Sequence, residues 1–211
     1  MRLMEMGLER LTKMVLDMAT LSEATVARAI DAYSNGLDVR EEVYGKSEQL
    51  ETLQDEVNDL SSEMIARYQP VASDLRFITS AMQISYGFSR LGRYAYDISD
   101  ILAVYKDIAG CDKSDVERAS KQAQEMIHLS IKAFVERDVF TAGKLKTMDN
   151  VVDDIYRTYI RRVLKEETMG DIKCYISTTL VLRYLERIAD HAEDVGESVA
   201  YTVTGKRAPH Q

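Results

Sequence analysis

The stretch Gly110-Cys111-Asp112-Lys113-Ser114-Asp115-Val116-Glu117 decides the fold, because it divides the chain into two halves with the same pattern. Gly110 and Asp112 favour a turn, and Ser114 with Glu117 has the spacing of a capping box that opens a helix. On both sides, apolar residues recur at three- and four-residue spacing, which predicts amphipathic helices. The sequence therefore predicts three helices before Gly110 and three after it.

The few chain breakers set the bounds of the six predicted helices. The helices are expected over residues 7–33, 38–67, 72–108, 114–137, 138–167 and 171–204. Asp38 with Glu41 forms another capping box, and Asp171 is expected to cap the last helix. Long helices with short connections pack as antiparallel bundles. The predicted fold class is all-α, with two pseudo-symmetric three-helix bundles in residues 1–110 and 111–211.

A self-comparison supports two copies of one unit. The predicted third and sixth helices align without gaps, so that Asp74-Leu75-Arg76 falls on Asp171-Ile172-Lys173 and Arg90-Leu91 falls on Arg187-Ile188. The identity between the halves is low, but the register agrees with the helix count, as expected for an internal repeat.

Composition narrows the class of protein further. The chain has 211 residues, with only 2 Pro and 10 Gly, too few for the turns of an all-β sandwich. A net charge of −8 argues against nucleic acid as a partner. Cys111 and Cys174 are too few for a disulfide framework, so we expect unpaired thiols in a reducing compartment. No apolar run approaches the roughly 20 residues of a membrane span. We expect a cytoplasmic protein that meets a membrane only through a partner.

An acidic row marks the last predicted helix. Glu186, Asp190, Asp194 and Glu197 fall within an arc of roughly 80° on one helix face. The preceding helix offers Asp149 and Asp153 at a four-residue spacing. If the two helices are antiparallel neighbours, these carboxylates converge, and a cation would relieve their repulsion.

Two interpretations of this row stay open. Hard oxygen ligands suit Mg²⁺, Mn²⁺ or iron, and less typically Zn²⁺. The alternative is a solvated acidic face, which is common on acidic proteins. His191 lies five residues after Glu186, which does not match the Glu-x-x-His spacing of ferritin-like di-iron proteins.

Three motifs resemble those of the PhoU family. Residues 183–194 (Arg-Tyr-Leu-Glu-Arg-Ile-Ala-Asp-His-Ala-Glu-Asp) resemble the family signature, and residues 201–205 (Tyr-Thr-Val-Thr-Gly) resemble its ending. Residues 69–77 (Gln-Pro-Val-Ala-Ser-Asp-Leu-Arg-Phe) are similar to the motif between the family's second and third helices. The resemblance covers nearly the whole chain. It implies two three-helix bundles, each with a surface metal cluster built from Glu/Asp-x-x-x-Asp motifs on two helices.

The resemblance also implies a function. Members of this family act with the phosphate ABC transporter, and in many bacteria with a phosphate-sensing histidine kinase, to restrain uptake and to repress phosphate-starvation genes. For this chain we therefore expect a non-enzymatic regulator that contacts the transporter's ATPase subunit and forms a homodimer. Two alternatives are a carboxylate metalloenzyme, either a phosphohydrolase or a di-iron protein, and an accessory protein of another phosphate carrier. No Gly-rich phosphate loop, nucleophile elbow or Cys/His zinc spacing is present.

On this resemblance the two halves differ as metal sites. The expected ligands lie in the second half: Asp149, Asp153, Glu186, Asp190 and Asp194, with Glu197 and His191 as further candidates. The equivalent positions of the first half hold Ser47, Glu51, Ser89, Arg93 and Asp97. Two ligands are replaced by serines, and an arginine supplies a fixed positive charge where a metal would sit. We therefore expect a degenerate first site, in which only Glu51 and Asp97 keep carboxylates.

Overall fold

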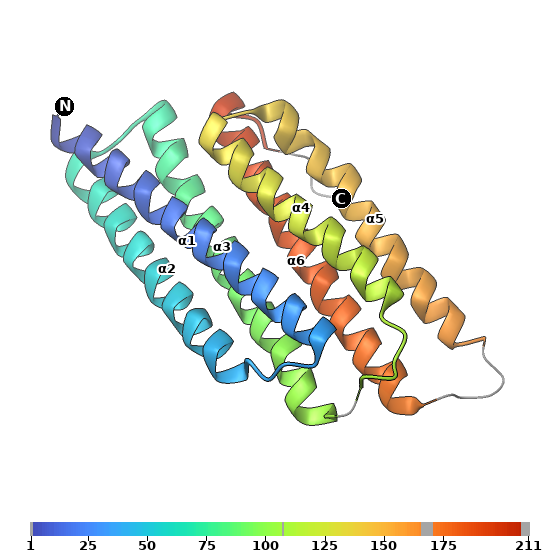
Figure 1. The fold of residues 1–211 in the computed structure, drawn as a ribbon. Coiled ribbons are helices and arrows are strands. Elements are labelled where there is room, and N and C mark those ends of the chain that lie inside the picture. Colours follow the sequence, from blue (N-terminus) through green and yellow to red (C-terminus); the bar gives the residue numbers. More distant parts are fainter. Residues whose placement is uncertain (1, 107, 166–170, 208–211) are drawn as a thin grey trace.

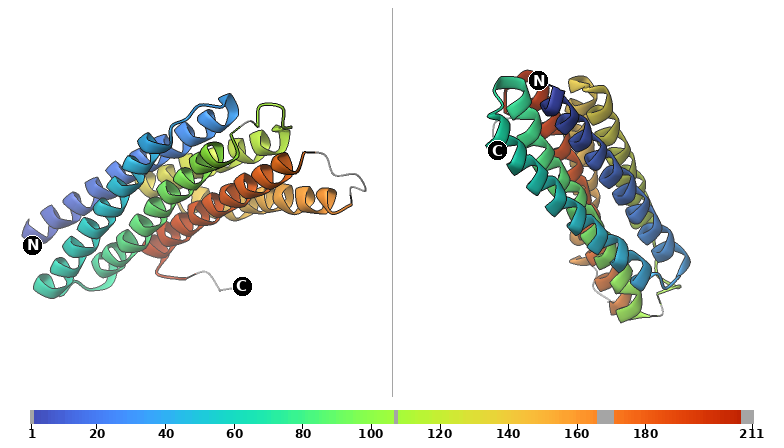
Figure 2. Two further views of the ribbon diagram at one scale, coloured as in Figure 1. Left: turned by 90° about the horizontal axis from the view of Figure 1, so that it is seen from below. Right: turned by 90° about the vertical axis from the view of Figure 1, so that its left-hand side faces the viewer.

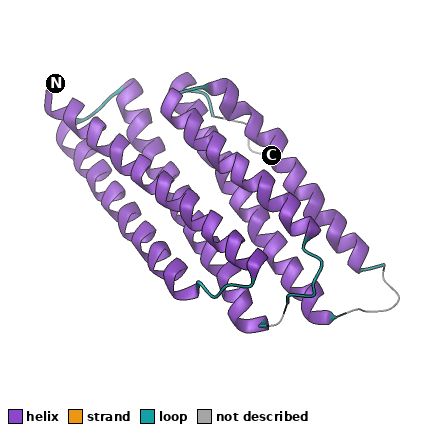
Figure 3. Ribbon diagram, in the orientation of Figure 1, coloured by secondary structure: helices purple, strands orange, loops and turns teal. Residues whose placement is uncertain are grey.

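The computed structural model describes residues 2–106, 108–165 and 171–207. It contains six α-helices: α1 (Arg2–Asn35), α2 (Arg40–Tyr68), α3 (Ala72–Tyr105), α4 (Ser114–Glu136), α5 (Val139–Val163) and α6 (Ile172–Thr204). Within those ranges every regular element is a helix and there is no β-strand (Figure 3). The predicted fold class is confirmed.

The helices form two three-helix bundles that lie side by side. Helices α1, α2 and α3 pack against one another, as do α4, α5 and α6 (Figure 1). The bundles meet mainly through α3 and α6, and α1 also contacts α4 (Figures 1 and 2). Their buried apolar side chains join into one continuous core. Among the described helices, none has an apolar stretch long enough to cross a lipid bilayer.

Aspartates begin four of the helices. Asp138 caps α5 by accepting the N–H of Phe140 at 2.9 Å, and the contacts at α2 and α4 differ from the prediction. Asp171 caps α6 as predicted, its side chain accepting a hydrogen bond from the backbone N–H of Lys173 at 2.9 Å. At α4 the acceptor is Asp112, which receives the N–H of Ser114 at 2.9 Å, so the predicted Ser114 cap is wrong. Asp38 likewise accepts from Arg40 at 3.2 Å. A short aspartate side chain reaches the backbone two residues on, which accounts for this choice.

Two helices end earlier than predicted. The helix α3 stops at Tyr105 rather than Ile108, because Lys106 leaves the helical conformation with a positive φ of 54°. Its N–H still bonds to the carbonyl of Leu102 at 3.0 Å, as in a normal helix end. The helix α5 stops at Val163. The last two residues of its predicted range, 166–167, lie outside the described residues.

The cysteines correct the sequence prediction of unpaired thiols. Cys111 in the α3–α4 connection forms a disulfide with Cys174 in the first turn of α6, with Cα atoms 5.3 Å apart. The two residues are separated by 63 positions, so only the folded chain brings them together. Helix packing places the α3–α4 connection and the start of α6 at the same end of the molecule (Figure 1).

Lys113 fixes the α3–α4 connection to the first bundle. Its ammonium donates hydrogen bonds to the backbone carbonyls of Tyr33 at 3.1 Å and Ser34 at 2.9 Å. The last carbonyls of a helix lack partners within that helix, so Lys113 satisfies two acceptors at the end of α1. The start of the second bundle is thereby held against the end of the first.

Glycines allow close helix contacts in both bundles. A Cβ atom at Gly196 of α6 would lie 2.5 Å from Leu145 Cδ1 and 3.2 Å from the carbonyl oxygen of Ala142 on α5. A Cβ atom at Gly92 of α3 would lie 2.5 Å from Leu50 Cδ1 on α2. The contact at Gly196 brings α5 and α6 together beside the acidic row.

Candidate metal centre

Carboxylates from α5 and α6 converge on the surface of the second bundle. One oxygen from each of Asp149, Asp153 and Asp190 lies within 4.8 Å of the other two, and all three residues are partly buried. Asp149 and Asp153 stand one turn apart on α5, while Asp190 comes from α6, which packs along α5. The structure thus brings together three of the five expected ligands.

These aspartates lie in a groove with an excess of negative charge. The groove has a volume of about 510 Å³ and contains six carboxylates: Asp149, Asp153, Asp190, Glu193, Asp194 and Glu197. Its cationic residues are Lys146, Arg157 and Arg187. Six acidic groups against three basic groups leave a net charge of −3 if all are ionised. The groove therefore favours a cation.

Asp149 is the most perturbed of these groups. Burial, followed by the negative charges of Asp190 and Glu193, raises the pKa of Asp149 to about 7. One of its carboxylate oxygens, Oδ1, is buried without a hydrogen-bond partner. A buried polar atom without a partner costs about 1–3 kcal/mol, and more when charged. A cation at this position would remove that cost.

Arginines neutralise the outer side of the cluster. Arg157 of α5 pairs with Asp153, and Arg187 Nη1 lies 3.2 Å from Asp190 Oδ2. Glu186 is held by Arg183, one turn before it on α6. Burial raises the pKa of both Glu186 and Asp190 in spite of these arginines. Of the three converging aspartates, Asp149 is the one without a paired arginine.

The remaining candidates lie outside the group of three. The side chain of Asp194 is 67% exposed, and its Oδ2 lies 3.5 Å from His191 Nδ1. The His191 ring stacks on Tyr94 of α3, with ring centroids 5.8 Å apart, and meets Tyr86 edge-on. His191 therefore packs between the bundles. Glu197 lines the groove but is exposed.

Sequence reasoning missed Glu193, although a signal was available. Counted from Glu186 at about 100° per residue, Glu193 lies about 20° to one side and Asp190 about 40° to the other. Asp194 lies about 80° round, further from the centre of the row. Glu193 accordingly lines the groove and raises the pKa of Asp149. Glu193 does not follow the four-residue spacing of Glu186, Asp190 and Asp194, although it lies on the same helix face.

The first bundle has no matching cluster. Arg93 Nε lies 3.3 Å from Asp97 Oδ1, so that the two residues neutralise each other. Ser47 and Ser89 are buried, and Glu51 is exposed. Within residues 2–106, no three potential ligands come together as they do in the second bundle. Burial raises the pKa of Asp97, and the charges of Arg93 and Arg90 oppose that shift.

The residues present at the second-bundle cluster fit a hard cation. All donors are carboxylate oxygens, which Mg²⁺, Mn²⁺ and iron accept readily. The buried Asp149 Oδ1 supplies an oxygen that no protein group uses.

Comparison with known proteins gives the same fold and a family. A phosphate-specific transport system accessory protein PhoU homolog of Synechocystis sp. is 30% identical to this chain over 208 residues, covering 96% of this chain and 92% of that protein. A homolog of the same description from Caulobacter vibrioides is 30% identical and covers 97% of this chain and 91% of its own length.

Solved structures agree with these relatives. The crystal structure of PhoU from Pseudomonas aeruginosa matches with a TM-score of 0.87 and 26% identity, covering 96% of this chain and 99% of that one. The Streptococcus pneumoniae phosphate transport system regulatory protein PhoU, at 20% identity, has the same fold with a TM-score of 0.87. The family model of the PhoU domain matches this chain twice, over residues 15–102 and 116–199. The chain therefore belongs to the PhoU family.

Proposed function

We propose that this chain is an accessory regulator of phosphate uptake that binds a metal ion on its second bundle. The relatives named above are described as accessory proteins of the phosphate-specific transport system, which supports the regulatory role. The observation that carries the metal proposal is the convergence of Asp149, Asp153 and Asp190 within 4.8 Å. The division of the chain at Gly110 into two repeats is part of the same proposal.

Five carboxylates would hold the metal, three of them at its centre and two beside it. Asp149, Asp153 and Asp190 form the centre, while Glu186 and Asp194 stand beside it on α6. A bound Mg²⁺, Mn²⁺, iron or Zn²⁺ ion would link α5 to α6 and offset most or all of the net negative charge of the groove. To join the centre, Glu186 would give up its contact with Arg183.

The partners are proposed from the family. We expect the ATPase subunit of a phosphate ABC transporter as the direct partner, a phosphate-sensing histidine kinase as a second one, and a homodimer in the cytoplasm. An accessory role with another phosphate carrier is the alternative. The relatives' names describe accessory proteins and not enzymes, which is why the groove beside the cluster is not assigned a reaction.

Deletion of the gene tests the regulatory role. In phosphate-rich medium the deletion strain should take up radioactive phosphate faster than its parent and express phosphate-starvation genes. The tagged chain should co-purify with the transporter's ATPase subunit. Unchanged uptake and unchanged expression in the deletion strain would contradict the proposed function.

A further inference from the structure

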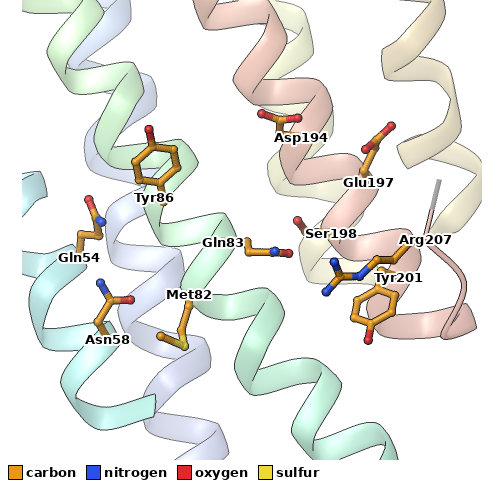
Figure 4. Close-up of a pocket in the computed structure, with 10 residues that line it drawn as sticks. All are labelled: Gln54, Asn58, Met82, Gln83, Tyr86, Asp194, Glu197, Ser198, Tyr201 and Arg207. Atoms are coloured by element: carbon orange, nitrogen blue, oxygen red, sulfur yellow. The ribbon is translucent and has the colours of Figure 1, made fainter. Parts of the chain in front are cut away.

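A second groove lies on the other side of α6 and spans the two bundles. It has a volume of about 490 Å³ and runs between α2 and α3 on one side and α6 on the other (Figure 4). The helix α6 lines it with Asp194, Glu197, Ser198 and Tyr201, which share one helix face. Asp194 and Glu197 are the two residues that it has in common with the acidic groove.

The groove combines carboxylates with open aromatic and amide groups. Tyr86 of α3 is 50% exposed, and Figure 4 shows it across the groove from the α6 carboxylates. The side-chain amides of Gln54, Asn58 and Gln83 also line the groove. Its volume is within the range of about 300–1,000 Å³ that is usual for ligand sites. These groups suit a ligand with a planar cation and a hydrogen-bonding backbone.

The chain itself places a guanidinium in this groove. After α6 the backbone turns at Gly205, which has φ of +71°, and Arg207 follows two residues later. The Arg207 guanidinium carbon lies 5.1 Å from the centre of the Tyr201 ring. Such a contact at an exposed site is worth about 0.5–1 kcal/mol. Arg207 has no ion pair within the described residues, so another guanidinium could displace it at low cost.

We propose that this groove binds an arginine side chain on an extended segment of a partner protein, and that Arg207 is an internal competitor for the same place. The partner's guanidinium would stack on Tyr86 or Tyr201 and donate hydrogen bonds to Asp194 and Glu197. Arginine suits this site better than lysine, because its planar group stacks on rings and pairs with carboxylates at the same time. A basic segment also complements the net charge of −8 of this chain.

The test is a titration of the full chain, labelled with ¹³C in its tyrosine rings, in the presence of a chelator. The probe is the blocked peptide acetyl-Gly-Ser-Arg-Ser-Gly-amide, and the matched peptide carries neutral citrulline in place of arginine. The ring signals of Tyr86 and Tyr201 should shift with the arginine peptide, and the citrulline peptide should bind about tenfold more weakly or not at all.

Variants separate this proposal from a general loss of structure. Arg207→Gln should tighten binding of the arginine peptide about two- to fivefold, because it removes the competitor, and misfolding would not produce a gain. Tyr86→Ala should weaken binding, whereas Tyr44→Ala, which removes a comparably exposed tyrosine of α2 outside the groove, should not. Equal affinity for the two peptides would overturn the proposal. So would unchanged or weaker binding in Arg207→Gln, or ring shifts confined to other tyrosines.

Discussion

The helices α3 and α6 occupy equivalent positions in the two bundles, yet one position on their equivalent faces carries a side chain of opposite charge. Tyr94 of α3 and His191 of α6 are equivalent in the aligned register, and their rings stack on each other where the bundles meet. Directly before each of these residues, Arg93 of α3 stands where α6 has Asp190. The scaffold is thus repeated while the charge at one position is reversed.

This reversal changes what the face can bind. In the first bundle, Arg93 lies 3.3 Å from Asp97 and neutralises it. Two unit charges about 4 Å apart interact by roughly 4 kcal/mol at an effective dielectric constant of 20, so Arg93 would also repel a cation strongly. In the second bundle, Asp149 has an unpartnered oxygen and no paired arginine. A few substitutions are therefore enough to replace an open carboxylate cluster by an internal ion pair.

Of the changes considered, removal of the Asp190 carboxylate should have the largest effect on metal binding by the second bundle. Asp190→Ala should weaken divalent metal binding about 100-fold or more, because loss of even an outer-shell partner typically costs 10–100-fold. Metal analysis and calorimetric titration measure the effect. The matched control is Asp97→Ala, the equivalent face of α3, which should leave metal binding unchanged. Undiminished metal in Asp190→Ala would show that the second bundle is not the site.

Replacing Gly196 of α6 and Gly92 of α3 by alanine should change the free energy of unfolding by different amounts. Gly196→Ala should lower the free energy of unfolding by about 1–3 kcal/mol, because the new Cβ meets the backbone of Ala142 as well as Leu145. Gly92→Ala meets mainly the end of the Leu50 side chain and gains about 1 kcal/mol of helix propensity. It should therefore be close to neutral in urea denaturation. Equal losses in both variants would contradict this difference.

The pKa of Asp149 is the most strongly raised of the described carboxylates, and it predicts a dependence of stability on pH. Its pKa is raised to about 7 in the folded state, so the folded protein binds a proton more tightly than the unfolded chain. The free energy of unfolding should then fall as the pH rises from about 4 to about 7. In a chelator, Asp149→Asn should gain about 1 kcal/mol relative to the parent between pH 5 and pH 8.

Urea denaturation at the two pH values measures this gain. Asp154→Asn, which changes an exposed carboxylate on the same helix, is the control and should show no gain. With metal present the sign should reverse, because Asp149→Asn loses a ligand. A parent protein whose stability rises between pH 5 and pH 8 relative to Asp149→Asn would contradict the raised pKa.

Restoration of the first site should have the smallest effect. Ser89→Glu combined with Arg93→Asp places the α6 carboxylates on the equivalent positions of α3. We expect weak additional metal binding, a fewfold above background, because Ser47 of α2 still lacks the carboxylate of its equivalent, Asp149. Anomalous scattering from crystals soaked in Mn²⁺ would locate it. Metal in the first bundle of the parent protein would show that Arg93 does not exclude a cation.

The fold was predictable because its signals are local. Apolar spacing and breakers such as Asn35-Gly36 and Gln69-Pro70 place all six helices. The errors are confined to helix ends such as Tyr105, where one residue with a positive φ stops the helix. The convergence of Asp149 with Asp190 was also predictable, because it needs only two helical faces and an antiparallel contact. The disulfide was not, because pairing over 63 positions depends on the packed fold.

The sequence could not predict which arginine pairs with which carboxylate. Whether Arg157 or Arg187 neutralises a given carboxylate depends on rotamers and on the distance between α5 and α6. The second groove was also out of reach, since its walls come from three helices of both bundles. His191 shows the same limit, because only the packing of α3 against α6 turns its ring toward Tyr94.

The disulfide between Cys111 and Cys174 closes a covalent ring within the second bundle, and the ring contains the whole of α4 and α5. A single proteolytic cut inside that ring leaves the chain in one covalent piece until the disulfide is reduced, whereas a cut within α1, α2 or α3 divides the chain into two covalent pieces. The aspartates of α5 are therefore connected to those of α6 by two routes along the chain. Their counterparts on α2 and α3 are connected by one.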